Sequence, residues 1–292
     1  MKILATGAAG MLGSALCPVL KRKNHEVLVT DLFPTNDGIE CLDVRNFKQV
    51  EELVESAEPD IVLHLAAETD VDKCELEPDH AFKTNTLGTL NVSLICQKRN
   101  IEMVYVSTIG VFYGDKLEPY TEFDNPRPIN IYGQSKLEGE KIVQNLLSRY
   151  YIIRAGWMVG GGPKKDKKFI GKIIRQMNES ARLKAVNDKI GSPTYTVDFS
   201  RCLADLIETG FYGLYHCTNK GYCSRFDVAR KIVDILGRSD VSVEPVSSAY
   251  FPLPALRARS EMSRNYKLEL LEMDTPRYWE VALEEYIKSW WK

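Results

Sequence analysis

Short apolar runs alternate with helical periodicity along the first half of the chain. Five runs rich in β-branched residues predict buried strands, and they occupy residues 2–6, 26–30, 60–66, 102–107 and 151–155. Between these runs, apolar residues recur at three- and four-residue spacing, as they do on one face of a helix. Strands that alternate with helices form βαβ units with right-handed crossovers. The pattern therefore predicts an α/β fold with a doubly wound parallel sheet.

The second half of the chain has a less regular pattern. The proline-rich stretch FPLPALRAR at 251–259 predicts a loop, and Pro276 is expected to begin an amphipathic C-terminal helix. The other predicted elements are helices near 169–178, 197–209 and 224–236, the last with Ser224 as its N-cap, and strands at 213–218 and 241–246. This mixture predicts a smaller mixed α/β lobe over the carboxyl ends of the parallel strands, where ligands of open α/β sheets bind.

A glycine-rich turn, GAAGMLG, directly follows the first predicted strand. Gly7, Gly10 and Gly13 in it have the spacing G-x-x-G-x-x-G. Glycines let the backbone turn tightly and approach a pyrophosphate, and the free N–H groups of the helix N-terminus then hold its phosphates. Between a first strand and a first helix, this motif predicts a Rossmann dinucleotide-binding turn, in which Met11 and Leu12 also contact the cofactor.

The glycine-rich turn places the predicted dinucleotide-binding domain in the first half of the chain. The dinucleotide-binding domain is expected at 1–158, with a segment at about 193–220 that returns to it. The substrate-binding lobe is expected at 159–192 and 221–275, and the C-terminal helix at 276–292.

Asp31 ends the second predicted strand, 18 residues after Gly13. An acidic side chain at this position accepts hydrogen bonds from the adenosine ribose hydroxyls and repels a 2′-phosphate. An aspartate that merely begins a turn is the alternative interpretation. Asp31 therefore favours NADH as the predicted cofactor. Because neighbouring basic residues can restore NADPH binding, the sequence predicts either NADH or NADPH.

Tyr132 and Lys136 lie four residues apart in YGQSKLEGE, in the first turns of a helix predicted to run to about residue 149. Residues at this spacing share one helical face, and a nearby ammonium is expected to lower the pKa of the phenol. Such a pair is common by chance on an exposed helix. Thr108 ends the fourth predicted strand and faces the same crevice, although Ser107 and Thr108 could instead cap the following loop. The conjunction with the glycine turn predicts a catalytic site.

Composition limits the partners of this site. The chain has 292 residues, 44% of them hydrophobic, and a net charge of −2, which gives no reason to invoke nucleic acid or membrane as a partner. The basic cluster KKDKK at 164–168 is either a solvated loop or an aid to binding an anionic ligand. Seven cysteines without CxxC or metal-ligand spacing argue against a disulfide framework and a metal site. A cytoplasmic location is expected, since no signal peptide or membrane span is evident.

With these motifs the sequence resembles the extended short-chain dehydrogenase/reductase superfamily, and within it the dTDP-4-dehydrorhamnose reductases. The resemblance covers nearly the whole chain. Its carriers are GAAGMLG, Asp43-Val44, LHLAAETDVDKCE (63–75), NTLGTLNV (85–92), STIGVFYG (107–114), YGQSKLEGE (132–140), RAGW (154–157), DKIGSPTYTVDFS (188–200) and GLYHCTNKG (213–221). Of these, GSPTYTVD and TDVDKCE are more specific to the reductases than the glycines or YxxxK.

The resemblance implies roles for single residues. Tyr132 would protonate the sugar carbonyl oxygen as hydride arrives, Lys136 would hold the nicotinamide ribose and lower the tyrosine pKa, and Thr108 would hydrogen-bond the reacting oxygen. The other cofactor-binding positions that it implies are Asp43 and Val44 at the adenine, and Ala66, Ala67 and Val106 along the cofactor. The implied substrate-binding positions are Thr69, Val71, Thr108, Trp157 and Arg257, with Arg257 as a contact to a nucleotide phosphate.

The chain departs from the reductase pattern at two places. The reductases usually show STDYVF, but Ile109 and Gly110 here replace the acidic and aromatic residues that would touch the substrate. The A-x-R-P segment of the reductases reads ALRA at 255–258, which keeps Arg257 and loses the proline. STIGVFYG is also similar to the S-S-x-x-V-Y-G pattern of sugar-nucleotide epimerases.

The leading hypothesis is a reductase that transfers hydride from NADH or NADPH to the C4 ketone of a nucleotide-linked 4-keto-6-deoxy sugar, with a homodimer as a possible assembly. One alternative is an NAD-dependent sugar-nucleotide epimerase; a dehydratase ranks lower, because Ile109 and Gly110 stand where dehydratases place an Asp-Glu pair. Another alternative is a non-catalytic regulatory subunit, like that of methionine adenosyltransferase, which resembles the same family. The intact Thr108, Tyr132 and Lys136 favour an enzyme.

Overall fold

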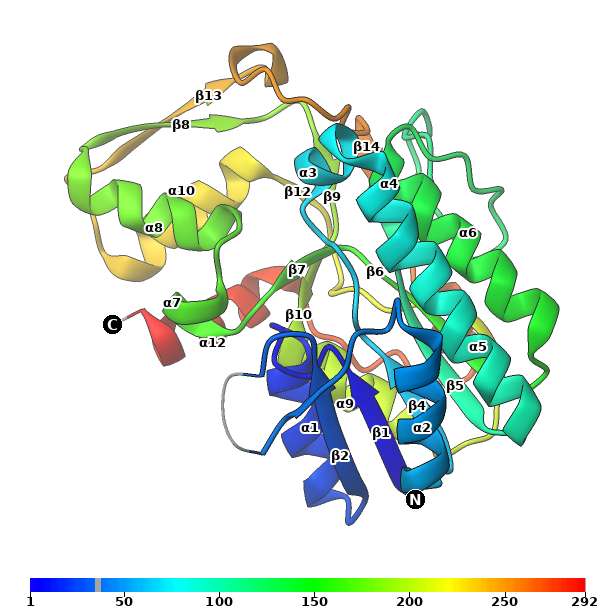
Figure 1. Ribbon diagram of the computed structural model, residues 1–292. Helices are drawn as coiled ribbons and strands as arrows, with labels where there is room; N and C mark the ends of the chain where they lie inside the picture. The colour runs from blue at the N-terminus through cyan, green and yellow to red at the C-terminus, as the bar shows by residue number, and fades with distance from the viewer. Residues whose placement is uncertain (35–37, 292) are drawn as a thin grey trace.

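The computed structural model describes residues 1–34 and 38–291. Its largest element is a seven-stranded parallel sheet (Figure 1) with the strand order β11-β6-β5-β4-β1-β2-β3. The strands are β1 (Lys2–Thr6), β2 (Glu26–Asp31), β3 (Glu40–Cys41), β4 (Ile61–His64), β5 (Glu102–Thr108), β6 (Tyr150–Ala155) and β11 (Gly213–His216). The chain runs outward from β1 in one direction and from β4 in the other, so the carboxyl ends of β1 and β4 form the switch point at which such sheets bind ligands. The predicted doubly wound fold is confirmed.

Helices cover both faces of this sheet (Figure 1). On one face, α1 (Gly13–Arg22) and α9 (Thr196–Leu206) bury Leu16, Leu20 and Leu203 against the strands. On the other, α2 (Phe47–Ala57), α5 (Gly88–Arg99) and α6 (Ile131–Leu146) contribute Val50, Val92 and Val143 to a second core. The predicted returning segment supplies α9 and β11, which lie on the large sheet; the predicted domain boundaries themselves stay a prediction.

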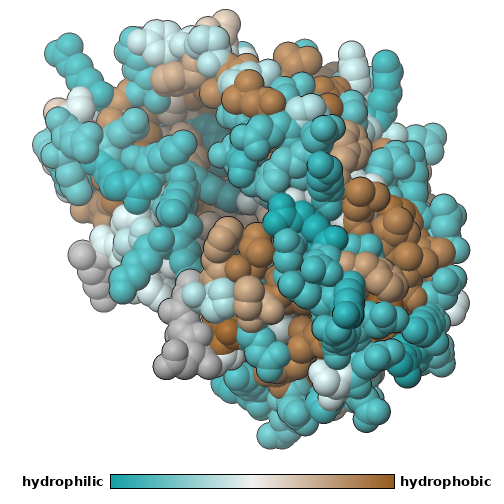
Figure 2. Space-filling model, in the orientation of Figure 1, coloured by the Kyte–Doolittle hydropathy of each residue, from teal (hydrophilic) through white to brown (hydrophobic). Residues whose placement is uncertain are grey.

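The smaller lobe lies beside the carboxyl ends of the strands (Figure 1). Its core is built by α8 (Phe169–Glu179), α10 (Arg225–Leu236) and α12 (Trp279–Trp290). As predicted, Ser224 caps α10, and the Asp227 carboxylate accepts the N–H of Ser224 in return, which completes a capping box. Its strands are β7 (Trp157–Val159) with β10 (Pro193–Tyr195), β8 (Arg182–Val186) with β13 (Ser242–Val246), and β9 (Ile190–Gly191) between β12 (Cys223–Ser224) and β14 (Ser260–Glu261). Figure 2 shows the surface between the two parts hollowed, with hydrophilic side chains around the rim.

Two predicted helix ends are wrong. Pro276 does not begin the C-terminal helix, because Lys220 and Tyr278 form a β-bridge and α12 begins only at Trp279. The α6 helix ends at Leu146 rather than near residue 149, since Leu147 already has an extended backbone. Residue 292, the end of the predicted C-terminal segment, lies outside the described residues.

No helix within residues 1–34 and 38–291 is long and apolar enough to cross a membrane. The cysteines in the same residues are free thiols, and all but Cys41 are buried. Nor do the described residues bring together three or more His, Cys, Asp or Glu side chains that could hold a metal ion.

Candidate active site

The glycine turn is as tight as its sequence predicts. Gly7 has a φ of +67°, and a Cβ on it would lie 2.6 Å from the backbone nitrogen of Ala66. A Cβ on Gly13 would lie 2.4 Å from the carbonyl oxygen of Ala8, where α1 packs against the turn. Both approaches are closer than any side chain allows, so only glycine fits at either position.

The N-terminus of α1 leaves backbone donors free for an anion. Gly10 donates its N–H to the carbonyl of Gly7, whereas the N–H groups of Met11, Leu12 and Gly13 have no acceptor within the described parts of the chain. These donors lie at the positive end of a ten-residue helix. The turn therefore fits the pyrophosphate of a dinucleotide, and this fit rests on its own backbone.

Asp31 holds the glycine turn to the end of β2. Its Oδ2 accepts a hydrogen bond of 3.0 Å from the N–H of Ala9, and its Oδ1 accepts one of 3.0 Å from the N–H of Phe33. The carboxylate thus begins a turn, as one interpretation of the sequence expected, and it also lies beside the predicted cofactor turn. Its contact with a ribose stays a prediction.

The remaining predicted cofactor positions follow β3, β4 and β5 or lie within them. Asp43 forms a two-pronged ion pair with Arg45, and these hydrogen bonds hold the pKa of the Asp43 carboxyl below its usual range. Val44 is buried in the core between α2 and α5. Ala66, which closes over Gly7, donates its N–H to Thr6. Two partly buried residues complete the set, Ala67 and Val106.

The structure brings Thr108 and Tyr132 together. Thr108 is the last residue of β5, and Tyr132 is the second residue of α6, whose N-cap Asn130 accepts the N–H of Gly133 at 2.8 Å. Thr108 Oγ1 accepts the N–H of Gly110 at 3.0 Å, so the capping role considered for it is also real. The Thr108 side chain lies close enough to Tyr132 to act on the pKa of its phenol.

The expected acidity of Tyr132 is wrong for the protein alone. Burial raises the pKa of Tyr132 well above its usual value, and the Thr108 hydroxyl only partly opposes this rise. The ammonium of Lys136 does not offset the burial, because its Nζ lies over the ring of Tyr105, 4.0 Å from the ring centroid. The phenol therefore keeps its proton at neutral pH, as a proton donor must.

Lys136 is a buried cation, with 3% of its surface exposed. Burial lowers the pKa of Lys136 to about 7, although the negative charge of Glu140 acts in the opposite direction. Its ammonium thus begins to lose its proton near neutral pH, where an exposed lysine would stay fully charged.

This lowered pKa predicts the pH dependence of catalysis. If the charged ammonium is the active form, kcat/KM for the cofactor should be level below pH 7 and fall up to about tenfold per pH unit above it. Steady-state profiles between pH 5.5 and pH 9 measure this fall. Lys136→Arg keeps a charge throughout this range, so its profile, at lower absolute rates, should lose the fall. A profile of the parent that is level to pH 9 contradicts the prediction.

A buried ion pair joins β6 to α6 next to Lys136 and Thr108. Arg154 donates two hydrogen bonds to Glu140, of 2.9 and 2.7 Å, and both side chains are at most 3% exposed. Ser107, next to Thr108, donates a third bond of 2.5 Å to the same carboxylate. The pair therefore fixes the end of β5 against α6. Sequence reasoning missed this role, although Glu140 is one helical turn after Lys136 in the KLEGE motif.

Asn85 joins the cofactor side of the site to α6. It lies in a π-helical turn, η1 (Phe82–Leu87), and is completely buried. Its amide accepts the N–H of Glu68 at 2.8 Å and donates to the Ser135 hydroxyl at 3.0 Å. Single π-helical turns often occur at functional sites. The NTLGTLNV motif contained this residue, but nothing in the sequence alone indicated the bonds.

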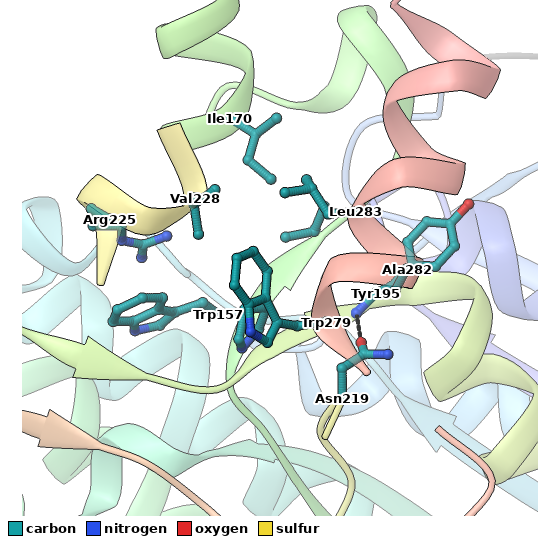
Figure 3. A pocket seen from close by; sticks show the side chains of 11 residues that line it. Trp157, Ile170, Tyr195, Asn219, Arg225, Val228, Trp279, Ala282 and Leu283 are labelled. Carbon is teal, nitrogen blue, oxygen red and sulfur yellow. Dashed lines mark hydrogen bonds between the residues drawn. The ribbon is translucent and has the colours of Figure 1, made fainter. Parts of the chain in front are cut away.

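Trp157 carries the predicted substrate surface. Its indole N–H donates to Glu261, and the face of its ring packs on Gly191, where a Cβ would lie 2.5 Å from the indole. The Arg225 guanidinium lies over the same indole, 3.7 Å from the ring centroid (Figure 3). Trp157 thus lies between a cation and an anion at the edge of an apolar pocket of the smaller lobe, whose other lining includes Ile170, Val228, Trp279 and Leu283.

Arg225 is a site residue that sequence reasoning missed. It is partly buried at the start of α10, and its guanidinium has no hydrogen-bond acceptor or ion-pair partner within the described residues. Burial lowers the pKa of Arg225 to about 10, with a smaller opposing effect from Glu261. Burial lowers the pKa of Lys168, from the basic cluster, and its ammonium lies near enough for the charge of Arg225 to lower this pKa further. An unpaired guanidinium beside other cations favours an anionic ligand.

The other predicted substrate positions gather around α3 (Val71–Leu76). Thr69 is exposed just before this helix, and Val71 is its first residue. Arg257 forms an ion pair of 3.0 Å with Asp72 and donates to the carbonyl of Ala255 at 2.8 Å. The proline-rich loop is thereby held against α3. The structure therefore leaves part of the Arg257 guanidinium available, with 32% of the side chain exposed.

Comparisons with known proteins agree with this geometry. The family described as "RmlD substrate binding domain" matches residues 1–291. The chain is 32% identical to the spore coat polysaccharide biosynthesis protein SpsK of Bacillus subtilis over 291 residues, 99% of this chain and 97% of that protein. It is also 32% identical to the dTDP-4-dehydrorhamnose reductase of Mycolicibacterium smegmatis, covering 99% of this chain and 85% of that protein.

Solved structures give the same result. A dTDP-4-dehydrorhamnose reductase from Clostridium acetobutylicum has a TM-score of 0.92 and 41% identity, with 99% of each chain covered. The reductase of Bacillus anthracis, solved in complex with NADP, has a TM-score of 0.90 and 36% identity over 99% of each chain. The protein therefore belongs to the dTDP-4-dehydrorhamnose reductase family, as the resemblance of its motifs predicted.

Proposed function

We propose that the protein is a reductase that transfers hydride from NADH or NADPH to the C4 ketone of a nucleotide-linked 4-keto-6-deoxy sugar. The observation that carries this proposal is the contact of the Thr108 side chain with the Tyr132 phenol, with Lys136 one helical turn further along α6, in a chain that matches the reductase family from end to end. The relatives are named for dTDP-4-dehydrorhamnose and dTDP-4-keto-6-deoxy-D-glucose as substrates.

Tyr132 is the proton donor in this proposal. A reduced nicotinamide bound at this site would supply the hydride for the sugar carbon, so negative charge would develop on the carbonyl oxygen. Tyr132 gives its proton to that oxygen, while the Thr108 hydroxyl holds the oxygen in place by a hydrogen bond. The raised pKa of Tyr132 supports this role, because the phenol enters each turnover protonated.

Lys136 orients the cofactor in this proposal. Its positive charge also stabilises the phenolate that Tyr132 becomes when it has given up its proton. Its ammonium lies one helical turn from Tyr132 and is held in place by the Tyr105 ring. The free N–H groups of Met11, Leu12 and Gly13 are the proposed contacts to the cofactor pyrophosphate, with Asp31 beside the adenosine ribose. We expect this carboxylate to favour NADH over NADPH, and the ratio of kcat/KM for the two cofactors tests it.

Arg225 and Arg257 are the proposed contacts to the diphosphate of the sugar nucleotide. The Arg225 guanidinium has no hydrogen-bond acceptor or ion-pair partner within the described chain, and the charge of Arg257 acts on it. We expect Arg225→Gln to raise KM for the sugar nucleotide about 30-fold with a smaller change in kcat, as loss of a desolvated charge contact does. Arg230→Gln, an exposed neighbour on the same helix, is the matched control and should leave KM unchanged. Equal KM values for the two variants contradict the assignment.

The reaction itself is tested by incubating the protein with NADH or NADPH and dTDP-4-keto-rhamnose, and by following the loss of cofactor absorbance. Oxidation of the added cofactor supports the reductase. An epimerase keeps its NAD through the reaction, so stoichiometric NAD released from the denatured protein, without oxidation of added cofactor, would favour that alternative. A partner enzyme that co-purifies while every 4-keto sugar nucleotide fails would favour the regulatory subunit. The homodimer and the cytoplasmic location stay predictions.

A further inference from the structure

Glu261 lies at the boundary between the two lobes. It ends β14, which pairs with β9 so that Glu261 lies opposite Gly191, the residue on which the Trp157 ring packs. Its backbone carbonyl accepts the N–H of Ser192 at 3.2 Å. The backbone of Glu261 is therefore fixed on a strand, and its side chain is partly buried.

The two carboxylate oxygens of Glu261 have different surroundings. Oε2 accepts the indole N–H of Trp157. Oε1 has no hydrogen-bond donor within the described residues. No cation lies within ion-pair distance of this carboxylate in the same part of the chain, although Arg225 is near enough to be affected by its charge. Oε2 therefore anchors the indole of Trp157, whereas Oε1 makes no such contact.

The free oxygen faces the catalytic residues. A Cβ built on Gly110 would lie 3.5 Å from Glu261 Oε1 and 3.2 Å from Thr108 Oγ1. Both oxygens therefore border one small volume above Gly110, next to the hydroxyl that is proposed to hold the reacting sugar oxygen. The charge of Glu261 also acts on Tyr132 and contributes to its raised pKa. Any side chain at residue 110 would occupy this volume.

We propose that Glu261 is a specificity-determining residue, whose Oε1 accepts a hydrogen bond from the sugar hydroxyl next to the reacting ketone. This inference rests on the proposed reductase function. An ionised carboxylate only accepts hydrogen bonds, so it selects a substrate with a donor at that carbon. Because Gly110 has no side chain, there is room for this hydroxyl next to Glu261. Glu261 then supplies the acidic contact to the substrate that Ile109 and Gly110 cannot make.

Substrate discrimination tests this inference. The two probes are dTDP-4-keto-rhamnose and the same sugar nucleotide with hydrogen in place of the 3-hydroxyl. The parent should prefer the hydroxylated probe by about 100-fold or more in kcat/KM, because the analogue leaves the carboxylate unpaired. Glu261→Ala should lower kcat/KM for the hydroxylated probe and reduce the preference to about threefold or less. Glu269→Gln, at a partly exposed carboxylate on the next helix that pairs with Arg264, should keep the parental preference.

Two more variants separate recognition from support of the indole. Trp157→Phe removes the indole N–H but leaves the carboxylate, so its preference should stay well above that of Glu261→Ala. Gly110→Ala fills the shared volume without changing Glu261, so it should also reduce the preference for the hydroxylated probe. This variant tests the inference even if Glu261→Ala does not fold. An equal loss with both probes in Glu261→Ala, or an unchanged preference in Gly110→Ala, overturns the inference. A parent that reduces neither probe instead refutes the proposed function.

Discussion

Replacing Tyr132 with phenylalanine should lower kcat about 1,000-fold while cofactor affinity stays within about threefold of the parent. A positioned general acid contributes roughly 10²- to 10⁴-fold to a rate, and phenylalanine removes the proton without removing the ring. The hydroxyl is also the group on which Thr108 acts. Single-turnover rates of cofactor oxidation measure the first effect, and quenching of protein fluorescence by the cofactor measures the second.

Tyr113→Phe is the matched control for this variant. Tyr113 is 44% exposed and its ring packs against Arg127, so its hydroxyl has no part in the proposed chemistry. We expect the control to react as fast as the parent. A Tyr132→Phe protein that is equally fast would remove Tyr132 from the mechanism.

Replacing Glu140 with glutamine should lower the free energy of unfolding by about 3 kcal/mol, since removing one partner of a buried ion pair leaves an uncompensated charge. Arg154 would keep its burial and lose the carboxylate that accepts both of its hydrogen bonds. The same change removes the negative charge that opposes the lowered pKa of Lys136. We therefore expect the fall of kcat/KM with pH to begin at a lower pH in this variant. Urea titrations and pH profiles measure the two effects.

Glu138→Gln tests whether burial is the cause. Glu138 pairs with Lys141 on the same helix, but both side chains are about half exposed. Removal of an exposed pair of this kind should change stability by no more than about 0.5 kcal/mol. Equal losses in the two variants would show that the buried pair has no special role.

The large sheet could be predicted from sequence because its signals are local. Each strand is a continuous apolar run, each helix has a 3.6-residue period, and the glycine turn joins the first strand to the first helix. The strands of the smaller lobe gave weaker signals. The β7, β9 and β10 strands have only two or three residues each, and their partners are distant in sequence, so tertiary pairing alone defines them.

The residues of the candidate site also differ in whether a local sequence signal predicts them. Motif spacing predicts Thr108, Tyr132 and Lys136 as site residues, and the structure puts them on adjoining ends of β5 and α6. The sign of the Tyr132 pKa shift was wrong, because sequence spacing gives a neighbouring charge but not the extent of burial. Arg225 and Glu261 carry no motif, and their relevance appears only where both flank the Trp157 ring.

The central claim is that this chain passes hydride from a nicotinamide to a sugar ketone. It is tested most directly with NADH or NADPH that carries deuterium at both C4 positions, incubated with dTDP-4-keto-rhamnose, followed by mass spectrometry and NMR of the sugar product. The account predicts one deuterium per product molecule, located at the sugar C4. A reduced product without deuterium, or cofactor that stays fully reduced with this substrate, would contradict it.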